Sequence, residues 1–162
     1  MSDLIIWRHA DAEFSEPDMD RKLTRKGKKQ ASRMGAWLDQ QLPENCKILC
    51  SPAQRALQTV EGLGRKYKIC NALAPDAGVE AAFELCQSEQ QSKALLLVGH
   101  QPTLGQLVSL FLTGSASDWT LRKGSIVWLA ERRPEEGEGG EGKKENARYY
   151  IKTVLPAELV EK

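Results

Sequence analysis

The sequence has little histidine and no long apolar run. Only two histidines, His9 and His100, occur in 162 residues. No apolar stretch approaches the roughly 20 residues that span a bilayer, so we expect no membrane association. The first residues lack the basic and then apolar segments of a secretory signal. We therefore expect a cytoplasmic protein.

Closely spaced cysteines and a strong charge bias are also lacking. The four cysteines form no C-x-x-C pair, so we expect reduced thiols and no zinc site; they are Cys46, Cys50, Cys70 and Cys86. A net charge of +1 argues against a nucleic-acid partner. With 41% hydrophobic and 28% charged residues, the composition is that of a globular protein whose oligomeric state is left open.

Short apolar segments alternate with amphipathic ones along the chain. We expect strands at Leu4–Trp7, Lys47–Cys50, Ile69–Leu73, Lys93–Val98, Gly124–Ala130 and Arg148–Leu155. We expect helices from a Thr24 cap to Leu42, from a Ser51 cap with Gln54 in a capping box to about Tyr67, at Val79–Gln91, and from Pro102 to Leu112. Pro134–Asn146 has no apolar residue and is expected to be a solvated loop. This alternation predicts one α/β domain over residues 1–162, with three α/β/α layers and a mostly parallel sheet.

Both histidines follow predicted strands, and a third strand end leads into a helix that carries Arg55. His9 comes directly after Arg8, and His100 follows the most apolar strand. Ligands bind beyond the carboxyl ends of parallel strands, so these side chains are expected to meet. Arginine forks and a helix N-terminus favour a phosphate-like anion, and imidazole can accept a phosphoryl group.

Three strings in these places resemble the histidine phosphatase superfamily, also called phosphoglycerate-mutase-like. They are Arg8-His9-Ala10, Ser51-Pro52-Ala53-Gln54-Arg55-Ala56-Leu57-Gln58-Thr59, and Gly99-His100-Gln101-Pro102. The segment Asp20-Arg21-Lys22-Leu23-Thr24-Arg25-Lys26-Gly27 is similar to that of the SixA-type phosphohistidine phosphatases. The resemblance covers nearly the whole chain.

The resemblance implies a role for each matched residue. His9 would be the nucleophile, Arg8 and Arg55 would hold the phosphoryl oxygens, and Arg21 would approach the phosphate from its loop. His100 would donate a hydrogen bond or stay charged to stabilise the transition state. Two arginines can supply the positive charge that other phosphatases take from Mg²⁺, so neither metal nor cofactor is expected. The implied substrate is phosphohistidine in a protein, with a histidine phosphotransfer domain as the suggested partner.

The chain departs from the resembled pattern in three places. Ala10 replaces the usual glycine, which would cost about 1 kcal/mol if the position needed positive φ. Lys22 stands where the branch commonly has proline. No carboxylate matches the general acid of the ester phosphatases. The candidates for that acid are Asp76, Glu80, Asp11 and Glu13. A missing acid fits phosphohistidine better than an alkyl ester, because its N–P bond is already labile.

Other interpretations remain. A cysteine phosphatase would need five residues between Cys50 and Arg55, and only four intervene. A metal hydrolase using His9, Asp11, Glu13 and His100 would place a cation beside Arg8. A phosphatase of small phosphoesters and a non-catalytic phosphate-binding module both stay open.

Basic residues are dense between Arg21 and Arg33 and alternate around the predicted helix, which is typical of a solvated face. We expect the start of this segment to lie at the rim of the site and to attract an acidic protein. Reversing Lys26, Lys28 and Lys29 should then raise KM for a phosphoprotein more than for a small phosphoester.

Overall fold

In the computed structural model, which describes residues 1–132 and 148–160, the chain forms a six-stranded sheet in the order β3-β2-β4-β1-β5-β6. The strands are β1 (Asp3–Arg8), β2 (Lys47–Cys50), β3 (Lys68–Ile69), β4 (Ala94–Gly99), β5 (Ile126–Glu131) and β6 (Tyr149–Leu155). The first four strands run parallel to one another, whereas β5 runs antiparallel to β1 and β6 antiparallel to β5.

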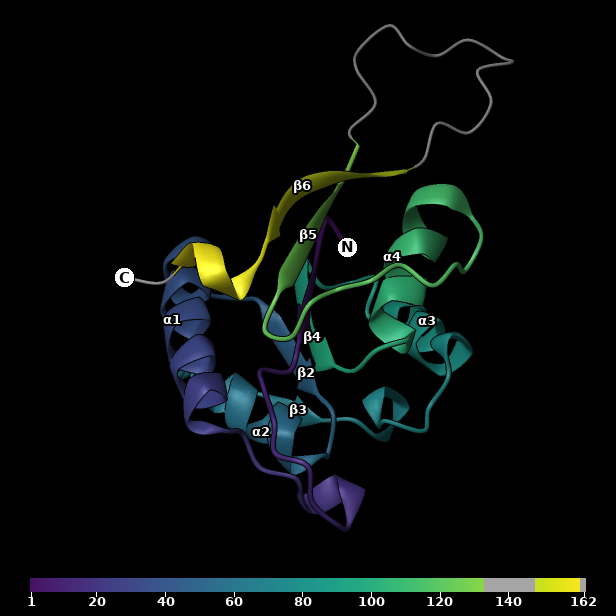
Figure 1. The fold of residues 1–162 in the computed structure, drawn as a ribbon. Helices are drawn as coiled ribbons and strands as arrows, with labels where there is room; N and C mark the ends of the chain where they lie inside the picture. The colour runs from purple at the N-terminus through teal and green to yellow at the C-terminus, as the bar shows by residue number, and fades with distance from the viewer. Residues whose placement is uncertain (133–147, 161–162) are drawn as a thin grey trace, which may run out of the picture.

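Helices cover both faces of this sheet. They are α1 (Arg25–Gln41), α2 (Gln54–Glu61), α3 (Val79–Ser88) and α4 (Thr103–Thr113), with short 3-10 turns η1 (Asp18–Asp20), η2 (Asn71–Leu73) and η3 (Ala157–Val160). Figure 1 shows α1 and α2 on one side of the sheet and α3 and α4 on the other. The predicted α/β fold with three layers and a mostly parallel sheet is therefore confirmed.

The apolar run of β1 is buried because its side chains feed two cores. Leu4 and Ile6 pack in the core that includes residues of α3 and α4, whereas Ile5 and Trp7 pack in the core beneath α1 and α2. Successive side chains of a strand point to opposite faces, so a central strand covered on both sides has no solvent-facing position. This burial fixes the end of β1, and therefore the place of the residue that follows it.

Three local predictions are corrected by the structure. The strand expected at Ile69–Leu73 is only Lys68–Ile69, and the chain then turns into η2. The helix expected to run to Tyr67 ends at Glu61, before a turn at Gly62 and Leu63 and the positive φ of Gly64. α2 also begins later than expected: its N-cap is Ala53, and no side chain caps it.

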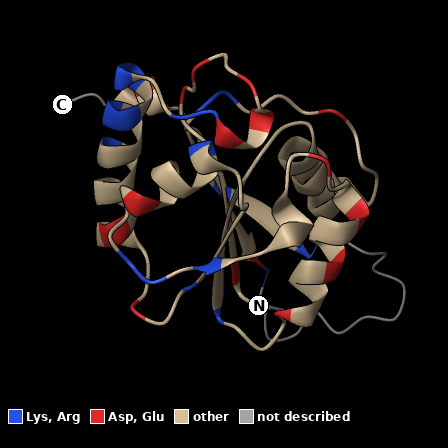
Figure 2. Cartoon of the chain, turned by 90° about the horizontal axis from the view of Figure 1, so that it is seen from below, with Lys and Arg blue, Asp and Glu red and all other residues tan. Residues whose placement is uncertain are grey.

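The Thr24 cap is confirmed, because its hydroxyl accepts a hydrogen bond from the Gly27 N–H at the start of α1. The loop expected at Pro134–Asn146 lies outside the described residues. No helix in the described part of the chain is both long and apolar enough to cross a membrane. Seen end-on in Figure 2, acidic and basic residues are mixed over the ribbon.

Candidate active site

The structure brings the two histidines together beyond the sheet. His9 follows β1 and His100 follows β4, and these strands pair in parallel with Arg8 opposite Gly99. The two ring centroids lie 5.2 Å apart, and both side chains are buried. The adjacent carboxyl ends of the strands thus place both imidazoles in one site, as the sequence predicted.

The ring of His9 is held in one tautomer by its own backbone. Its Nδ1 lies 2.7 Å from the carbonyl oxygen of Ala10. A carbonyl oxygen only accepts, so Nδ1 must carry the proton and the neutral ring has its lone pair at Nε2. Nε2 is the nitrogen that a nucleophilic histidine would use.

Ala10 is buried and fixed in turn by α2. Its N–H donates to the hydroxyl of Thr59 at 3.0 Å, and that hydroxyl donates to the carbonyl of Arg55 at 2.7 Å. Among the described residues, none other than glycine has a positive φ. Ala10 therefore has a negative φ, and replacing the usual glycine by alanine does not strain the backbone at this position.

His100 is held by Ser51, at the end of β2. The Nε2 of His100 lies 2.7 Å from the Ser51 hydroxyl, which also accepts a bond from the N–H of Ala53 at 3.1 Å. The predicted role of Ser51 as a helix cap is wrong, because this hydroxyl bonds within the turn before α2 and to the histidine. The other ring nitrogen of His100 is buried and finds no partner in the described structure.

Two arginines surround the histidines with donors that the protein does not fully use. Arg55, on the first turn of α2, is almost completely buried, and Arg8 is half-buried. The Nη1 of Arg8 donates to the carbonyl of Leu121 at 2.7 Å. The Nε atoms of both arginines are buried without a partner among the described residues. Unpaired buried donors are costly, so their gathering here indicates a place for an anion.

The same burial and charges keep both imidazoles neutral. Burial, followed by the charges of Arg55, Arg8 and Arg21, lowers the pKa of His9 to about 4, although the Ala10 carbonyl opposes this shift. Burial, His9 and Arg55 lower the pKa of His100 to about 3. Before an anion binds, His100 is therefore suited to hydrogen bonding rather than to acting as a cation.

A carboxylate that the sequence analysis did not select reaches the arginines. Asp18 of η1 places its Oδ2 3.2 Å from Nη2 of Arg55 and its Oδ1 3.3 Å from Nη1 of Arg21. Its backbone carbonyl accepts a further bond from Nη1 of Arg55 at 2.9 Å. Partial burial alone would raise the pKa of Asp18, but the hydrogen bond from Arg21 and the charge of Arg55 outweigh it and lower that pKa. The sequence signal was the acid three residues before Arg21.

The four proposed general acids are dispersed. Asp76 lines a cavity of about 700 Å³ together with Asp18 and Pro52. Hydrogen bonds from Thr24 and Lys123 lower the pKa of Asp11 despite its partial burial, and this lowered pKa disfavours proton donation near neutral pH. Glu13 offers its backbone carbonyl to Arg21, and Glu80 lies on the first turn of α3.

Cys50, the alternative nucleophile of a cysteine phosphatase, does not reach the site as a reactive thiol. Cys50 is fully buried in β2, and burial raises the pKa of its thiol. A thiol that stays protonated is a poor nucleophile. Within residues 1–132 and 148–160, no group of three or more histidine, cysteine or acidic side chains is arranged to hold a metal ion.

Comparison with known sequences places the chain among related proteins. The model of the histidine phosphatase superfamily (branch 1) matches residues 4–78. Phosphohistidine phosphatase SixA of Escherichia coli (strain K12) is 30% identical over 120 residues, which cover 68% of this chain and 74% of that protein. An uncharacterised protein of Mycobacterium tuberculosis (strain H37Rv) is 32% identical over 118 residues, covering 68% and 73%.

The fold has solved counterparts. The structure of the protein histidine phosphatase SixA complexed with tungstate superposes with a TM-score of 0.76 at 22% identity. The match covers 98% of this chain and 99% of that one. At this identity the likeness concerns the fold, and it extends over the whole sheet and both helical layers.

Proposed function

Because the chain belongs to the histidine phosphatase superfamily and is a phosphatase, we propose that it removes the phosphoryl group from phosphohistidine in a protein. The reaction passes through a phosphoryl group carried by His9. The observation that supports this most strongly is the set of buried polar groups without a partner, the Nε–H donors of Arg8 and Arg55 and the Nδ1 of His100, together with a neutral His9. A phosphoryl dianion would satisfy donors that the protein leaves without partners.

In the first step, Nε2 of His9 attacks phosphorus, a new N–P bond forms, and the bond to the substrate nitrogen breaks. The electron pair of the broken bond stays on the departing imidazole, whose other ring nitrogen already carries a proton, so the ring leaves in its neutral form. In the second step water attacks the phosphorus, an O–P bond forms and the N–P bond to His9 breaks; its electron pair returns to Nε2, and the protons of the water leave with inorganic phosphate. The Ala10 carbonyl keeps the ring proton on Nδ1, so Nε2 is free to attack at the start and is again free when phosphate has left.

The arginines neutralise the charge on the transferring group. Loss of one phosphate-binding donor costs about 3–4 kcal/mol in the transition state, so Arg55→Ala should slow turnover by about 100–1000-fold. Arg8 and Arg55 supply this charge from the protein itself. We therefore expect activity to persist in the presence of a metal chelator.

The state of Asp18 supports a nitrogen leaving group. Arg21 and Arg55 hold this carboxylate ionised, so it does not offer a proton at neutral pH. An alkoxide needs a strong general acid when it leaves, whereas a phosphorylated imidazole leaves readily. A histidine phosphotransfer domain is the partner that the SixA resemblance suggests for such a substrate.

A panel of substrates tests the proposal. The wild-type protein and His9→Ala are assayed on a phosphohistidine protein, a phosphoserine peptide and a small phosphoester, with circular dichroism as the check on folding. Turnover of phosphohistidine above the other two, abolished in folded His9→Ala, is the expected result. Preferred turnover of the small phosphoester would refute the substrate, and phosphate binding without turnover of any substrate would refute catalysis.

A further inference from the structure

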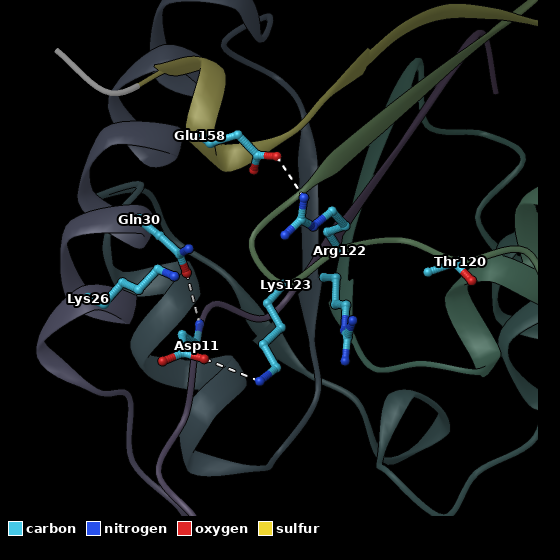
Figure 3. Close-up of a pocket in the computed structure, with 8 residues that line it drawn as sticks. Asp11, Lys26, Gln30, Thr120, Arg122, Lys123 and Glu158 are labelled. Carbon is cyan, nitrogen blue, oxygen red and sulfur yellow. Dashed lines mark hydrogen bonds and ion pairs between the residues drawn. The ribbon is translucent and has the colours of Figure 1, made fainter.

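A second cavity opens directly beside the end of β1. Its volume is about 520 Å³. Figure 3 shows Lys26 and Gln30 projecting from α1 on one side, Arg122 and Lys123 on the other, and Asp11 between them. Glu158 of η3 closes the far end.

This cavity adjoins the phosphoryl site through the backbone that holds it. Arg8 lines the cavity and is also one of the arginines beside His9. The N–H of Gly124, next to Lys123, donates to the carbonyl oxygens of both Arg8 and His9, at 3.1 and 2.9 Å. An extended chain advances about 3.3–3.6 Å per residue. A residue a few positions from a phosphohistidine bound at His9 can therefore reach the cavity.

The charge of the lining favours an anion. Four cationic side chains, those of Arg8, Lys26, Arg122 and Lys123, face two carboxylates, those of Asp11 and Glu158. Positive charge is thus in excess by two, and by one when Arg8 is assigned to the phosphoryl group.

Both carboxylates are already paired within the protein. Asp11 accepts from the Thr24 hydroxyl at 2.7 Å and lies 3.2 Å from Nζ of Lys123. Glu158 lies 3.0 Å from Arg122. Lys26 makes no ion pair within 4.0 Å of another described residue, although its charge contributes to the low pKa of Asp11, so its ammonium can meet an incoming group without breaking a close contact.

We propose that this cavity is a specificity subsite that takes an acidic side chain flanking the phosphohistidine of a protein substrate. The proposal rests on the proposed function. A carboxylate fits the excess charge better than a second phosphate, because the paired carboxylates of the lining would repel a dianion more strongly. Among the three lysines whose reversal should raise KM for a phosphoprotein, the subsite assigns this effect to Lys26. Lys28 and Lys29 do not line the cavity.

Matched peptides test the subsite. A phosphohistidine peptide carries Glu, or Gln as the neutral control, at each position from one to four residues on either side of the phosphohistidine. At the preferred position the wild-type protein should show about five-fold higher kcat/KM for the Glu peptide than for the Gln peptide, mainly because KM is lower. This factor is the one expected from one or two exposed charge pairs. Salt should reduce this ratio towards one.

Two charge reversals on α1 distinguish binding in the cavity from a general electrostatic attraction between the protein and an acidic peptide. In Lys26→Glu the ratio of Glu to Gln peptide should fall to one or below. In Lys29→Glu, which changes the net charge equally outside the cavity, the wild-type ratio should remain. Equal turnover of both peptides at every position by the wild-type protein, or equal effects of the two reversals, would overturn the subsite while leaving the proposed function intact. Failure to turn over any phosphohistidine peptide would overturn the subsite, and failure on the phosphohistidine protein of the substrate panel as well would overturn both.

Discussion

Asp18 occupies donors that a phosphoryl group needs. Its carboxylate lies 3.2 Å from Nη2 of Arg55 and 3.3 Å from Nη1 of Arg21. A phosphate bound beside His9 must displace this carboxylate or share the guanidinium groups with it. We therefore predict that Asp18→Asn, which keeps the shape of the side chain and removes its charge, binds inorganic phosphate more tightly than the wild-type protein.

The size of this effect follows from the exposure of the carboxylate. The side chain of Asp18 is 54% exposed, so its two ion pairs are strongly screened by solvent. Exposed pairs contribute about 0.2–1 kcal/mol each, which gives about 1 kcal/mol for the two together. The dissociation constant of phosphate should then fall about five-fold in Asp18→Asn. The carbonyl of Asp18 still accepts from Arg55, so the arginine should keep its position.

Calorimetric titration with inorganic phosphate measures this constant without depending on turnover. Asp20→Asn is the matched control, because Asp20 is an exposed residue of the same turn and makes no ion pair with the described residues. The dissociation constant of phosphate should fall far less in Asp20→Asn than in Asp18→Asn. An unchanged or weaker affinity in Asp18→Asn would contradict competition between this carboxylate and phosphate, and would mean that the carboxylate positions Arg55.

Two further predictions concern pH and packing. Because the pKa values of His9 and His100 lie near 4 and 3, both rings should stay neutral at pH 5.5, and histidine-selective NMR should show two rings that do not titrate near 6.5. In the unfolded chain both histidines gain protons below about pH 6.5, so stability should be full above that pH and fall as pH drops towards the folded pKa values. The loss from pH 7 to pH 5 should be about 4 kcal/mol for the pair, measured by urea unfolding, and a flat stability over that range would contradict the burial of neutral rings. Gly35→Ala should destabilise the fold by about 1–3 kcal/mol, because a Cβ on α1 would collide with the backbone of Gly62. Gly78→Ala, whose Cβ would meet only the end of the Glu80 side chain, should change the urea midpoint much less, and equal shifts would contradict this packing argument.

The sheet and the meeting of its strand ends could be predicted because they depend on strong local signals. The run Leu4–Trp7 can be buried only in a central strand, and its end fixes the place of His9. The run Ala94–Gly99 does the same for His100. Parallel pairing then brings the two residues together whatever the loops do.

The contacts that depend on loops could not be predicted in this way. Ser51 has the local pattern of a helix cap, yet tertiary structure places its hydroxyl against His100. Asp18 lies in a polar loop whose sequence does not say where it folds. A bridge between Ala12 and Leu23 closes that loop and carries Asp18 over Arg55. The cavity beside β1 likewise combines segments that are far apart in the chain.

The central claim is that the phosphoryl group passes through His9. Rapid quenching of the wild-type protein with a radiolabelled phosphohistidine protein, followed by peptide mapping, tests this claim most directly. We expect an acid-labile, base-stable label on the peptide that contains His9, and no such label in folded His9→Ala. Turnover with no label on His9, or a label on His100 or Cys50, would contradict it.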